Sequence, residues 1–309
     1  MEKRLIFVHA LSPLHAGTGQ GVGVIDLPIA KEKATGLPYL PGSSLKGTLR
    51  DEFNDESQKD LRNKIFGPEK DRASEHAGAI QFTDQTLLLL PVRSLAGTFA
   101  WVTSPYILRR LKRDATDAGA NALPADIPEP GGESHCEVHS KDNGMDVTKL
   151  IVSGVNKVCL EDLDLEPTES TSVKDWADWL KGRVFPASSP WQEMLGKRLC
   201  VVHDDVLSFI LNTATEITAR VKIQDDAKTV QSGGLWYEEA LPTESVLFGL
   251  ALAFPNDKTV INGQKLTPQK IFEEVGKKLD KTLQFGGKAT VGRGICHVSM
   301  SNGAAPNGG

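Results

Sequence analysis

The chain has 309 residues, of which 39% are hydrophobic and 24% charged, with a formal net charge of −5. This composition is typical of a globular protein with a buried core. No run of about 18 apolar residues occurs, so the sequence predicts no membrane-spanning helix and no membrane partner. We expect a reducing compartment, the cytoplasm, and no disulfide framework, because no Cys-x-x-Cys pair occurs among Cys136, Cys159, Cys200 and Cys296.

The net charge hides an uneven distribution. Residues 1–50 hold six Lys and Arg against three Asp and Glu, a net of +3, and residues 281–309 hold three basic residues and no acid, again +3. The remaining residues 51–280 carry a net of −11. Both basic ends are also rich in glycine, so an anion site could form where they meet, if the two termini share one sheet.

The first 53 residues predict a strand, a loop and a helix. Residues 4–11 form an apolar run bounded by Ser-Pro, typical of a core strand, and residues 16–25 form a glycine-rich loop. A single carboxylate, Asp26, follows among apolar neighbours. Residues 41–53 predict a helix, because Leu45, Leu49 and Phe53 recur every four residues. Ser43 or Ser44 is the expected N-cap, and Lys46 and Arg50 lie on a neighbouring face.

The middle of the chain alternates strands and helices. Strands are expected at 79–84, 86–93 and 97–103, and helices at 104–119, 173–183, 190–200 and 204–214, the last capped by Asp204 or Asp205. Residues 119–149 lack periodicity and are typical of an insertion or a mobile region. This insertion contains His135, Cys136 and His139, whose spacing fits no standard zinc motif, so we do not predict structural zinc there.

The last third begins with a projecting element. Residues 215–240 predict a β-hairpin with a polar tip, which offers little to a core. A buried strand (244–254), a helix (268–283), a second glycine-rich loop and a final strand ending near 300 follow. Residues 301–309 predict a disordered tail.

The second glycine-rich loop combines small residues with positive charge. Gly286, Gly287, Gly292 and Gly294 accompany Lys288 and Arg293, so that backbone amides could approach a polyanion. Neither G-x-G-x-x-G nor G-x-x-x-x-G-K-[ST] occurs, which disfavours a small-molecule phosphate enzyme. Ordinary turn glycines are the alternative interpretation of this loop taken alone.

Two stretches carry a resemblance to a known family. HAGTGQGVGVIDLPIAKEKATGLPYLPGSSLKGTLR (15–50) together with GGKATVGRG (286–294) resembles the backbone RAMP (repeat-associated mysterious protein) subunits of the type III-B CRISPR effector, the Cmr complex. The resemblance implies an α+β fold: a ferredoxin-like, RRM-related palm in one domain over 1–300, a helical insertion at about 119–200, and a β-hairpin thumb at about 215–240.

The resemblance also implies a function. Such subunits stack with copies of themselves and with other subunits of the complex into a helical filament along a guide CRISPR RNA. The thumb displaces a nucleotide at regular intervals, and each subunit cuts the paired target RNA beside it. We therefore expect a metal-dependent endoribonuclease that acts by 2′-hydroxyl attack and spares DNA.

Individual residues receive roles from the same resemblance. Asp26 matches the slicing acid, either as ligand of one hydrated Mg²⁺ or Mn²⁺ or as the group that positions the 2′-hydroxyl. His15 is the expected acid or phosphate contact, with a strand-end polar residue as the alternative; Tyr237 and Glu238 of the thumb complete the expected catalytic set. The expected RNA-binding residues are Lys46, Arg50, Ser43, Ser44, Gly286, Gly287, Lys288 and Arg293.

Two other functions within the family stay open. A CRISPR RNA-processing endonuclease is disfavoured by the long hairpin and by the single Asp in place of a compact His, Tyr and Lys site. A non-catalytic guide-RNA filament subunit would have no need of Asp26. If Asp26 is only a turn aspartate, that second alternative stands.

Overall fold

The structure is a computed structural model. It describes residues 1–17, 25–69, 76–142, 144–186, 189–224, 230–255, 259–261 and 263–301. Most of the first glycine-rich loop, with Gly19, Gly21 and Gly23, therefore lies outside the described residues, as does the predicted tail from residue 302 onward. Ser301, which was assigned to that tail, is instead the last residue of a paired strand.

Strands and helices alternate along the described part of the chain. The helices are α1 Gly42–Asp51, α2 Lys59–Phe66, α3 Pro105–Asp117, α4 Thr171–Val184, α5 Ser189–Arg198, α6 Asp204–Ile210 and α7 Pro268–Gly276, with 3₁₀ turns η1 Glu56–Gln58 and η3 Ala289–Val291. The strands are β1 Glu2–Ala10, β2 Tyr39–Leu40, β3 Ile80–Phe82, β4 Gln85–Arg93, β5 Phe99–Thr103, β6 His135–Val138, β7 Lys141–Asp142, β8 Met145–Asp146, β9 Ile151–Val152, β10 Lys157–Leu160, β11 Leu163–Glu169, β12 Leu199–Val202, β13 Glu216–Ile223, β14 Val230–Ala240, β15 Val246–Ala253, β16 Val260–Ile261, β17 Gln264–Lys265, β18 Leu283–Gln284 and β19 Ile295–Ser301.

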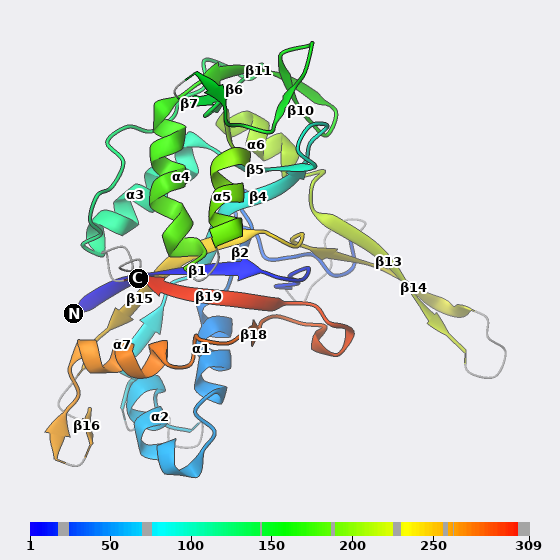
Figure 1. Cartoon of the computed structure of the whole chain (residues 1–309). Coiled ribbons are helices and arrows are strands. Elements are labelled where there is room, and N and C mark those ends of the chain that lie inside the picture. The colour runs from blue at the N-terminus through cyan, green and yellow to red at the C-terminus, as the bar shows by residue number, and fades with distance from the viewer. Residues whose placement is uncertain are drawn as a thin grey trace.

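One large mixed sheet organises the molecule, in the order β18-β19-β1-β15-β4-β5-β12-β6-β11-β10-β9. β1 pairs antiparallel with both β15 and β19, so the first and last strands lie side by side (Figure 1). The predicted condition for an anion site, that both basic ends share one sheet, is therefore met. The buried runs Leu5–Val8 and Leu87–Leu90 explain why these strands take the centre.

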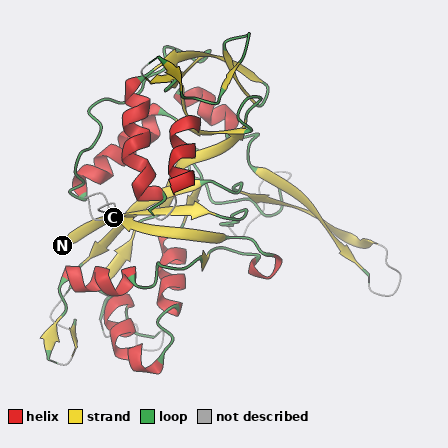
Figure 2. Ribbon diagram, in the orientation of Figure 1, coloured by secondary structure: helices red, strands yellow, loops and turns green. Residues whose placement is uncertain are grey.

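Helices cover the sheet around β1 from two sides (Figure 2). α4 packs against β1 and β19 on one side, while α1 packs on β3 and α7 on β15 on the other. α1 presents the fully buried Leu45 and Leu49 to the core, as their four-residue spacing predicts. None of the helices in the described ranges is long and apolar enough to cross a membrane.

The predicted hairpin is present and stands apart from the large sheet. β13 and β14 pair antiparallel over Glu216↔Ala240 to Ile223↔Val230 and form a separate two-stranded sheet. The hairpin extends away from the body of the molecule (Figure 1). Within the described residues, β13 and β14 form a ladder only with each other.

Two predicted helix caps were wrong. Pro41, not Ser43 or Ser44, is the N-cap of α1, and the amide of the first helical residue Gly42 donates instead to Asp84 Oδ1 at 2.9 Å. A distant carboxylate therefore replaces the local hydroxyl. At α6 the N-cap is His203, whose ring accepts from the Asp205 amide, so the two predicted aspartates lie in the first turn.

The other differences concern length and content. α6 and α7 end at Ile210 and Gly276, several residues before the predicted ends at 214 and 283, and the chain after α7 turns back so that β18 can pair with β19. Residues 119–200, predicted as a helical insertion, also contribute β6, β11 and β12 to the large sheet. Within it Cys136 is a buried free thiol, and His139 Nδ1 contacts Glu169 Oε1 at 3.0 Å.

Candidate functional site

The end of β1 and the second glycine-rich loop meet directly. The Gly287 amide donates to the His15 carbonyl at 3.1 Å, and the Gly294 amide donates to the Pro13 carbonyl at 2.9 Å. Gly286 has φ +73°, and a Cβ there would lie 2.2 Å from the His15 carbonyl oxygen. Only glycine fits at this position, because both the backbone conformation and the space exclude a side chain. The loop thereby fixes the backbone of His15.

His15 is buried, and one of its ring nitrogens is assigned by its partner. Nδ1 lies 2.7 Å from the carbonyl oxygen of Glu239 on β14. A carbonyl oxygen can only accept, so Nδ1 carries the hydrogen, and in the neutral ring Nε2 keeps its lone pair. The Nε2 edge faces Gly17, where a Cβ would approach within 2.6 Å. His15 therefore presents Nε2 as its proton-accepting atom.

Asp26 is exposed and is held by the root of the hairpin. Its Oδ2 accepts from the backbone amide of Tyr237 at 2.8 Å. The next residue, Leu27, forms a parallel bridge to β14, since its amide donates to the Tyr237 carbonyl at 3.1 Å. The carboxylate thus has a fixed place beside β14 and an open side toward solvent. The Tyr237 side chain is itself 40% exposed.

Glu238 differs from the expected catalytic acid in its surroundings. It is 2% exposed, and its oxygens contact Lys288 Nζ at 2.9 Å, the Trp236 indole nitrogen at 2.7 Å and Arg220 Nε at 3.4 Å. Burial raises the pKa of this carboxyl, but the hydrogen bonds from Lys288 and Trp236 and the charges of Lys288 and Arg220 outweigh it and lower the pKa to about 2. An acid of that pKa stays ionised and is a poor proton donor or acceptor. The contacts favour a role in holding cations.

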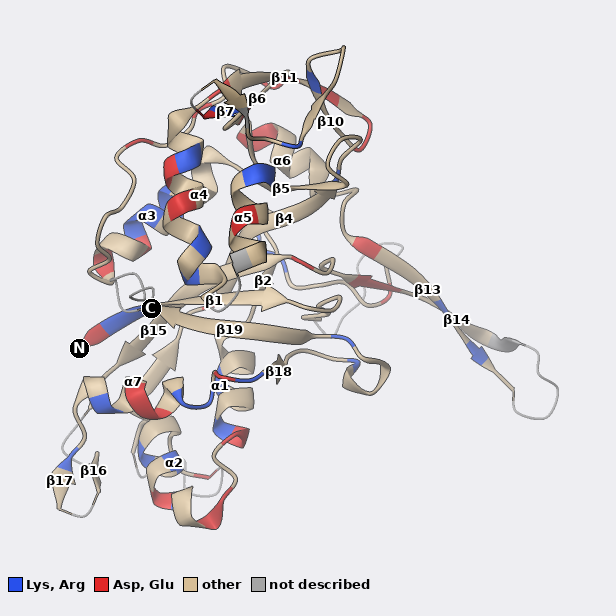
Figure 3. Ribbon diagram, viewed as in Figure 1, with Lys and Arg blue, Asp and Glu red and all other residues tan. Residues whose placement is uncertain are grey.

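The loop between β18 and β19 contains basic residues (Figure 3), and two of them, Lys288 and Arg293, contact residues of the hairpin. Lys288, in a left-handed conformation with φ +68°, extends over the Trp236 ring at 5.8 Å. Arg293 is 6% exposed, and its Nη2 donates to Thr218 Oγ1 at 3.2 Å. Arg293 Nη1 is buried and has no hydrogen-bond partner within the described ranges. Leaving such a donor unpaired costs stability, so the contact with Thr218 is the one that holds the guanidinium in place.

The two basic residues of the predicted helix face, Lys46 and Arg50, have different surroundings. The Arg50 guanidinium donates to the Gly67 carbonyl and to Asn63 Oδ1, which ties α1 to the end of α2. Burial, followed by repulsion from Arg50, lowers the pKa of Lys46, and no described residue pairs with its ammonium group. Ser43 is exposed and Ser44 half-buried in the first turn. Of these four predicted contacts, Lys46 is the best placed to gain an anionic partner.

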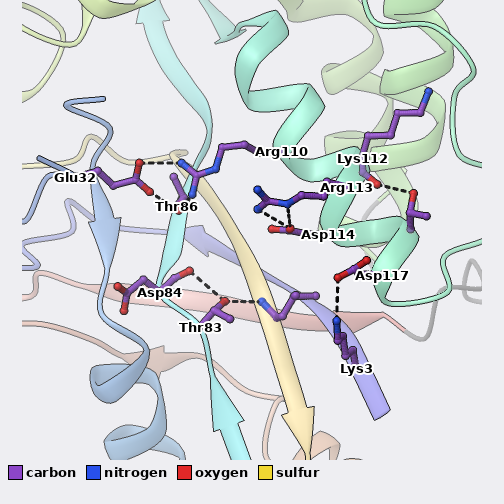
Figure 4. Close-up of polar contacts among 12 residues, drawn as sticks. Lys3, Glu32, Thr83, Asp84, Thr86, Arg110, Lys112, Arg113, Asp114 and Asp117 are labelled. Carbon is purple, nitrogen blue, oxygen red and sulfur yellow. Dashed lines mark hydrogen bonds and ion pairs between the residues drawn. The ribbon is translucent and has the colours of Figure 1, made fainter. Parts of the chain in front are cut away.

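The segment that carries Asp26 continues into a turn that is anchored separately. Arg110 of α3 donates to Glu32 Oε2 at 2.8 Å and to Thr86 Oγ1 at 3.3 Å (Figure 4). Burial raises the pKa of Glu32, but hydrogen bonds from Thr35 and Arg110 outweigh it and leave that pKa lowered. The segment is therefore fixed both at β14 and at α3.

A metal would find few protein ligands here. Within the described ranges no group of three or more His, Cys, Asp and Glu side chains is placed to hold an ion. Asp26 offers one exposed carboxylate, which fits a hydrated Mg²⁺ or Mn²⁺ that keeps most of its ligands as water and phosphate oxygens. A site built from protein ligands alone does not fit.

Some residues of this site were not singled out by the sequence. Lys31, Arg220 and Trp236 all contact one of the two adjacent glutamates at the hairpin root. The signal that could have found them is strand alternation, because consecutive residues of β14 must point to opposite faces. Glu238 and Glu239 are therefore expected to contact different residues.

Comparison with protein-family models identifies the class of protein that has this fold and site. The sequence matches the RAMP superfamily over residues 7–297, and the chain belongs to that superfamily. This match confirms the family part of the predicted resemblance.

Particular relatives narrow the assignment. The chain is 35% identical over 314 residues to the "CRISPR system Cmr endoribonuclease Cmr4" of Pyrococcus furiosus, covering 100% of this chain and 99% of the relative. It is 25% identical over 315 residues to the "CRISPR system CMR subunit Cmr4" of Saccharolobus solfataricus, covering 96% of each. The crystal structure of oligomeric Cmr4 from Pyrococcus furiosus superposes with a TM-score of 0.72 at 28% identity, over 97% of this chain and 98% of that one. The chain is a homologue of the Cmr4 proteins.

Proposed function

We propose that this chain is the backbone subunit of a type III-B CRISPR RNA-guided complex, which binds guide RNA and cleaves complementary target RNA at regular intervals. The observation that carries the proposal is the exposed Asp26 carboxylate, held by the Tyr237 amide at the root of the projecting hairpin. The relatives support it, since one is named an endoribonuclease and another structure is described as oligomeric.

Guide binding uses the basic rim of the site. Lys288 is one-third exposed, and Lys46 has no partner among the described residues, so both can contact backbone phosphates. Arg293 is buried and contacts Thr218 of β13, so it adds its positive charge beneath the same rim. Gly286 and Gly287 let the loop pack closely on the backbone of His15, and Arg50 ties α1 to α2. Ser43 and Ser44 lie at the start of α1, where their hydroxyl groups would contact phosphate. These contacts hold the backbone, and base pairing supplies the sequence specificity.

Cleavage proceeds by attack of a target 2′-hydroxyl on the adjacent phosphorus. The new oxygen–phosphorus bond forms as the bond to the 5′-oxygen breaks, which leaves a cyclic phosphate and a 5′-hydroxyl. Asp26 orients the attacking hydroxyl, and His15 Nε2 accepts or returns the proton. In ordinary A-form geometry a 2′-hydroxyl is not in line with the phosphorus and the leaving 5′-oxygen. Bringing these atoms into line therefore contributes much of the rate.

The hairpin supplies that alignment. Ile217, Val221, Leu235 and Tyr237 are each at least 40% exposed and lie on one face of the ribbon. This apolar ribbon enters the guide–target duplex of the assembled filament and displaces one nucleotide for each subunit. The copy-to-copy spacing then sets the interval between cuts.

A divalent metal belongs to the proposed reaction. Asp26 would hold a hydrated Mg²⁺ or Mn²⁺, which neutralises charge on the reacting phosphate when it is bound. The work of the chain itself is to fix the Asp26 carboxylate and the His15 ring along the same edge of β14, at Tyr237 and Glu239.

The test is an Asp26→Asn comparison in a reconstituted complex with guide, Mg²⁺ and end-labelled complementary RNA. We expect evenly spaced cuts from the wild type, and binding without cuts from Asp26→Asn. A complex whose cuts persist unchanged would show that Asp26 is structural. That outcome would favour the non-catalytic filament subunit, with the nuclease elsewhere in the assembly.

A further inference from the structure

β14 carries two adjacent glutamates that are almost fully buried and point to opposite faces of the hairpin root. Glu238 and Glu239 are 2% and 1% exposed. The Glu238 carboxylate contacts Lys288 and Arg220 on the face toward the glycine-rich loop. The Glu239 carboxylate lies on the other face, against the segment that follows Asp26. One strand thus presents a buried negative charge to each side.

Glu239 binds the Asp26 segment through both of its carboxylate oxygens. Oε2 accepts from the Ile29 amide at 3.1 Å, and Oε1 contacts Lys31 Nζ at 2.7 Å. Its backbone amide also donates to the Leu27 carbonyl at 3.0 Å. Three alternate residues of the segment, 27, 29 and 31, are therefore fixed by one residue of the hairpin.

The same residue also holds the second half of the site. The Glu239 carbonyl accepts from His15 Nδ1 at 2.7 Å, which fixes the ring and its tautomer. Asp26 lies next to Leu27 and takes its own hydrogen bond from Tyr237, two positions before Glu239. Any shift of the hairpin root relative to the 25–31 segment would therefore move Asp26 and His15 relative to each other.

From these contacts we infer that Glu239 is a positioning residue, which couples the placement of the hairpin to the cleavage site while Glu238 serves the guide-binding face. The inference rests on the proposed function of Asp26 and His15. Its physical basis is that reactions which depend on alignment lose on the order of 10²-fold in rate for a displacement of about 1 Å. Neither glutamate needs to touch RNA for this effect.

Two isosteric variants on neighbouring residues test the assignment. Glu239→Gln removes the charge that holds Lys31, and its amide nitrogen can no longer accept from one of the two donors, the Ile29 amide or Lys31 Nζ. Glu238→Gln makes the same chemical change on the opposite face. The first measurement is amide hydrogen exchange of residues 25–31 in the full-length chain without RNA. We expect exchange of this segment to rise at least several-fold in Glu239→Gln and to stay at the wild-type level in Glu238→Gln.

The second measurement separates turnover from binding in the reconstituted complex. Glu239→Gln should lower kcat for target cleavage by roughly 10- to 100-fold and leave guide and target affinity within about twofold. Lys31→Ala should lower kcat in the same direction, and Lys31→Arg, which keeps the charge, should restore most of it. Glu238→Gln should instead weaken guide binding.

The outcomes distinguish this inference from the proposed function. If Glu239→Gln leaves both the exchange of residues 25–31 and kcat unchanged while Asp26→Asn abolishes cleavage, Glu239 is not a positioning residue and the proposed function stands. If exchange rises in Glu239→Gln but Asp26→Asn cuts normally, the coupling exists and Asp26 is not catalytic. Equal effects of both glutamate variants on exchange would mean a general loosening of the hairpin and would overturn the division of roles.

Discussion

Gly286 and Gly292 make a matched pair for a prediction worked from the structure. Both have left-handed backbones, with φ +73° and +77°. A Cβ on Gly286 would lie 2.2 Å from the His15 carbonyl oxygen, whereas a Cβ on Gly292 would meet nothing within 4 Å. Alanine therefore introduces the same conformational strain at both positions and a backbone clash at only one.

The magnitude follows from these two contributions. The left-handed conformation costs alanine about 1–2 kcal/mol at either position. At Gly286 the His15 carbonyl must also move away, which removes the hydrogen bond that it accepts from the Gly287 amide at 3.1 Å. Leaving a buried acceptor unpaired adds about 1–3 kcal/mol. At roughly 2 °C per kcal/mol for a chain of this length, Gly286→Ala should unfold roughly 2–6 °C below Gly292→Ala.

Thermal unfolding of the two purified variants beside wild type, followed by circular dichroism, provides the assay. Gly292→Ala controls for the strain itself and for the loss of unfolded-state entropy. Since the clash lies at His15, Gly286→Ala should also lower target cleavage in the reconstituted complex. Equal melting temperatures for the two variants would refute the view that the glycine-rich loop is packed against the end of β1.

Three further predictions concern charge and metal. The depressed pKa of Glu238, about 2 against the ordinary 4.5, contributes stability that is fully present above pH 4.5 and is lost as the pH falls toward 2. The gap in unfolding free energy between wild type and Glu238→Gln should therefore shrink across that window in urea titrations, and a constant gap would contradict the ion-pair assignment. Lys288→Ala should weaken guide binding and reduce the slope of log K against log salt by roughly 0.7, the value for one phosphate contact of a single strand; an unchanged slope would place Lys288 off the RNA. EDTA should stop target cleavage without releasing RNA, with recovery on adding Mg²⁺ or Mn²⁺, and cutting that persists in the chelator would remove the metal from the proposal.

Much of the architecture was predictable because it rests on local pattern. The apolar run Leu87–Leu90 has the length of a buried strand, and Leu45 and Leu49 have helical spacing; the structure confirms both predictions. The α1 cap was not predictable, because Asp84 reaches the Gly42 amide across 42 residues of sequence. In the same way, Lys31 meets Glu239 from 208 residues away, and no local signal announces such a pair.

The candidate site was predictable in part for the same reason. Asp26 stood out because an isolated carboxylate among apolar neighbours has few local reasons to be there. The sequence led us to select Glu238, although residue type alone does not distinguish it from the adjacent Glu239. The structure ranks them by environment: one is neutralised by Lys288 and Arg220, and the other is joined to the segment that carries Asp26.

The hairpin reverses the usual distribution of polar and apolar residues. Residues of β13 that face the body are polar, such as Thr218 and Arg220, while Ile217 and Val221 on the opposite face are about half exposed. A two-stranded ribbon is only marginally stable by itself when its apolar face is exposed to water. The ion pairs of Arg220 and Lys288 with Glu238 fasten the root of the hairpin, and the apolar side chains on the opposite face stay exposed. The hairpin is therefore held by many contacts at its root, beside Asp26, while its apolar side chains are exposed farther out. The proposed function needs both features, because a hairpin that enters an RNA duplex must keep its place relative to the cleaved phosphate.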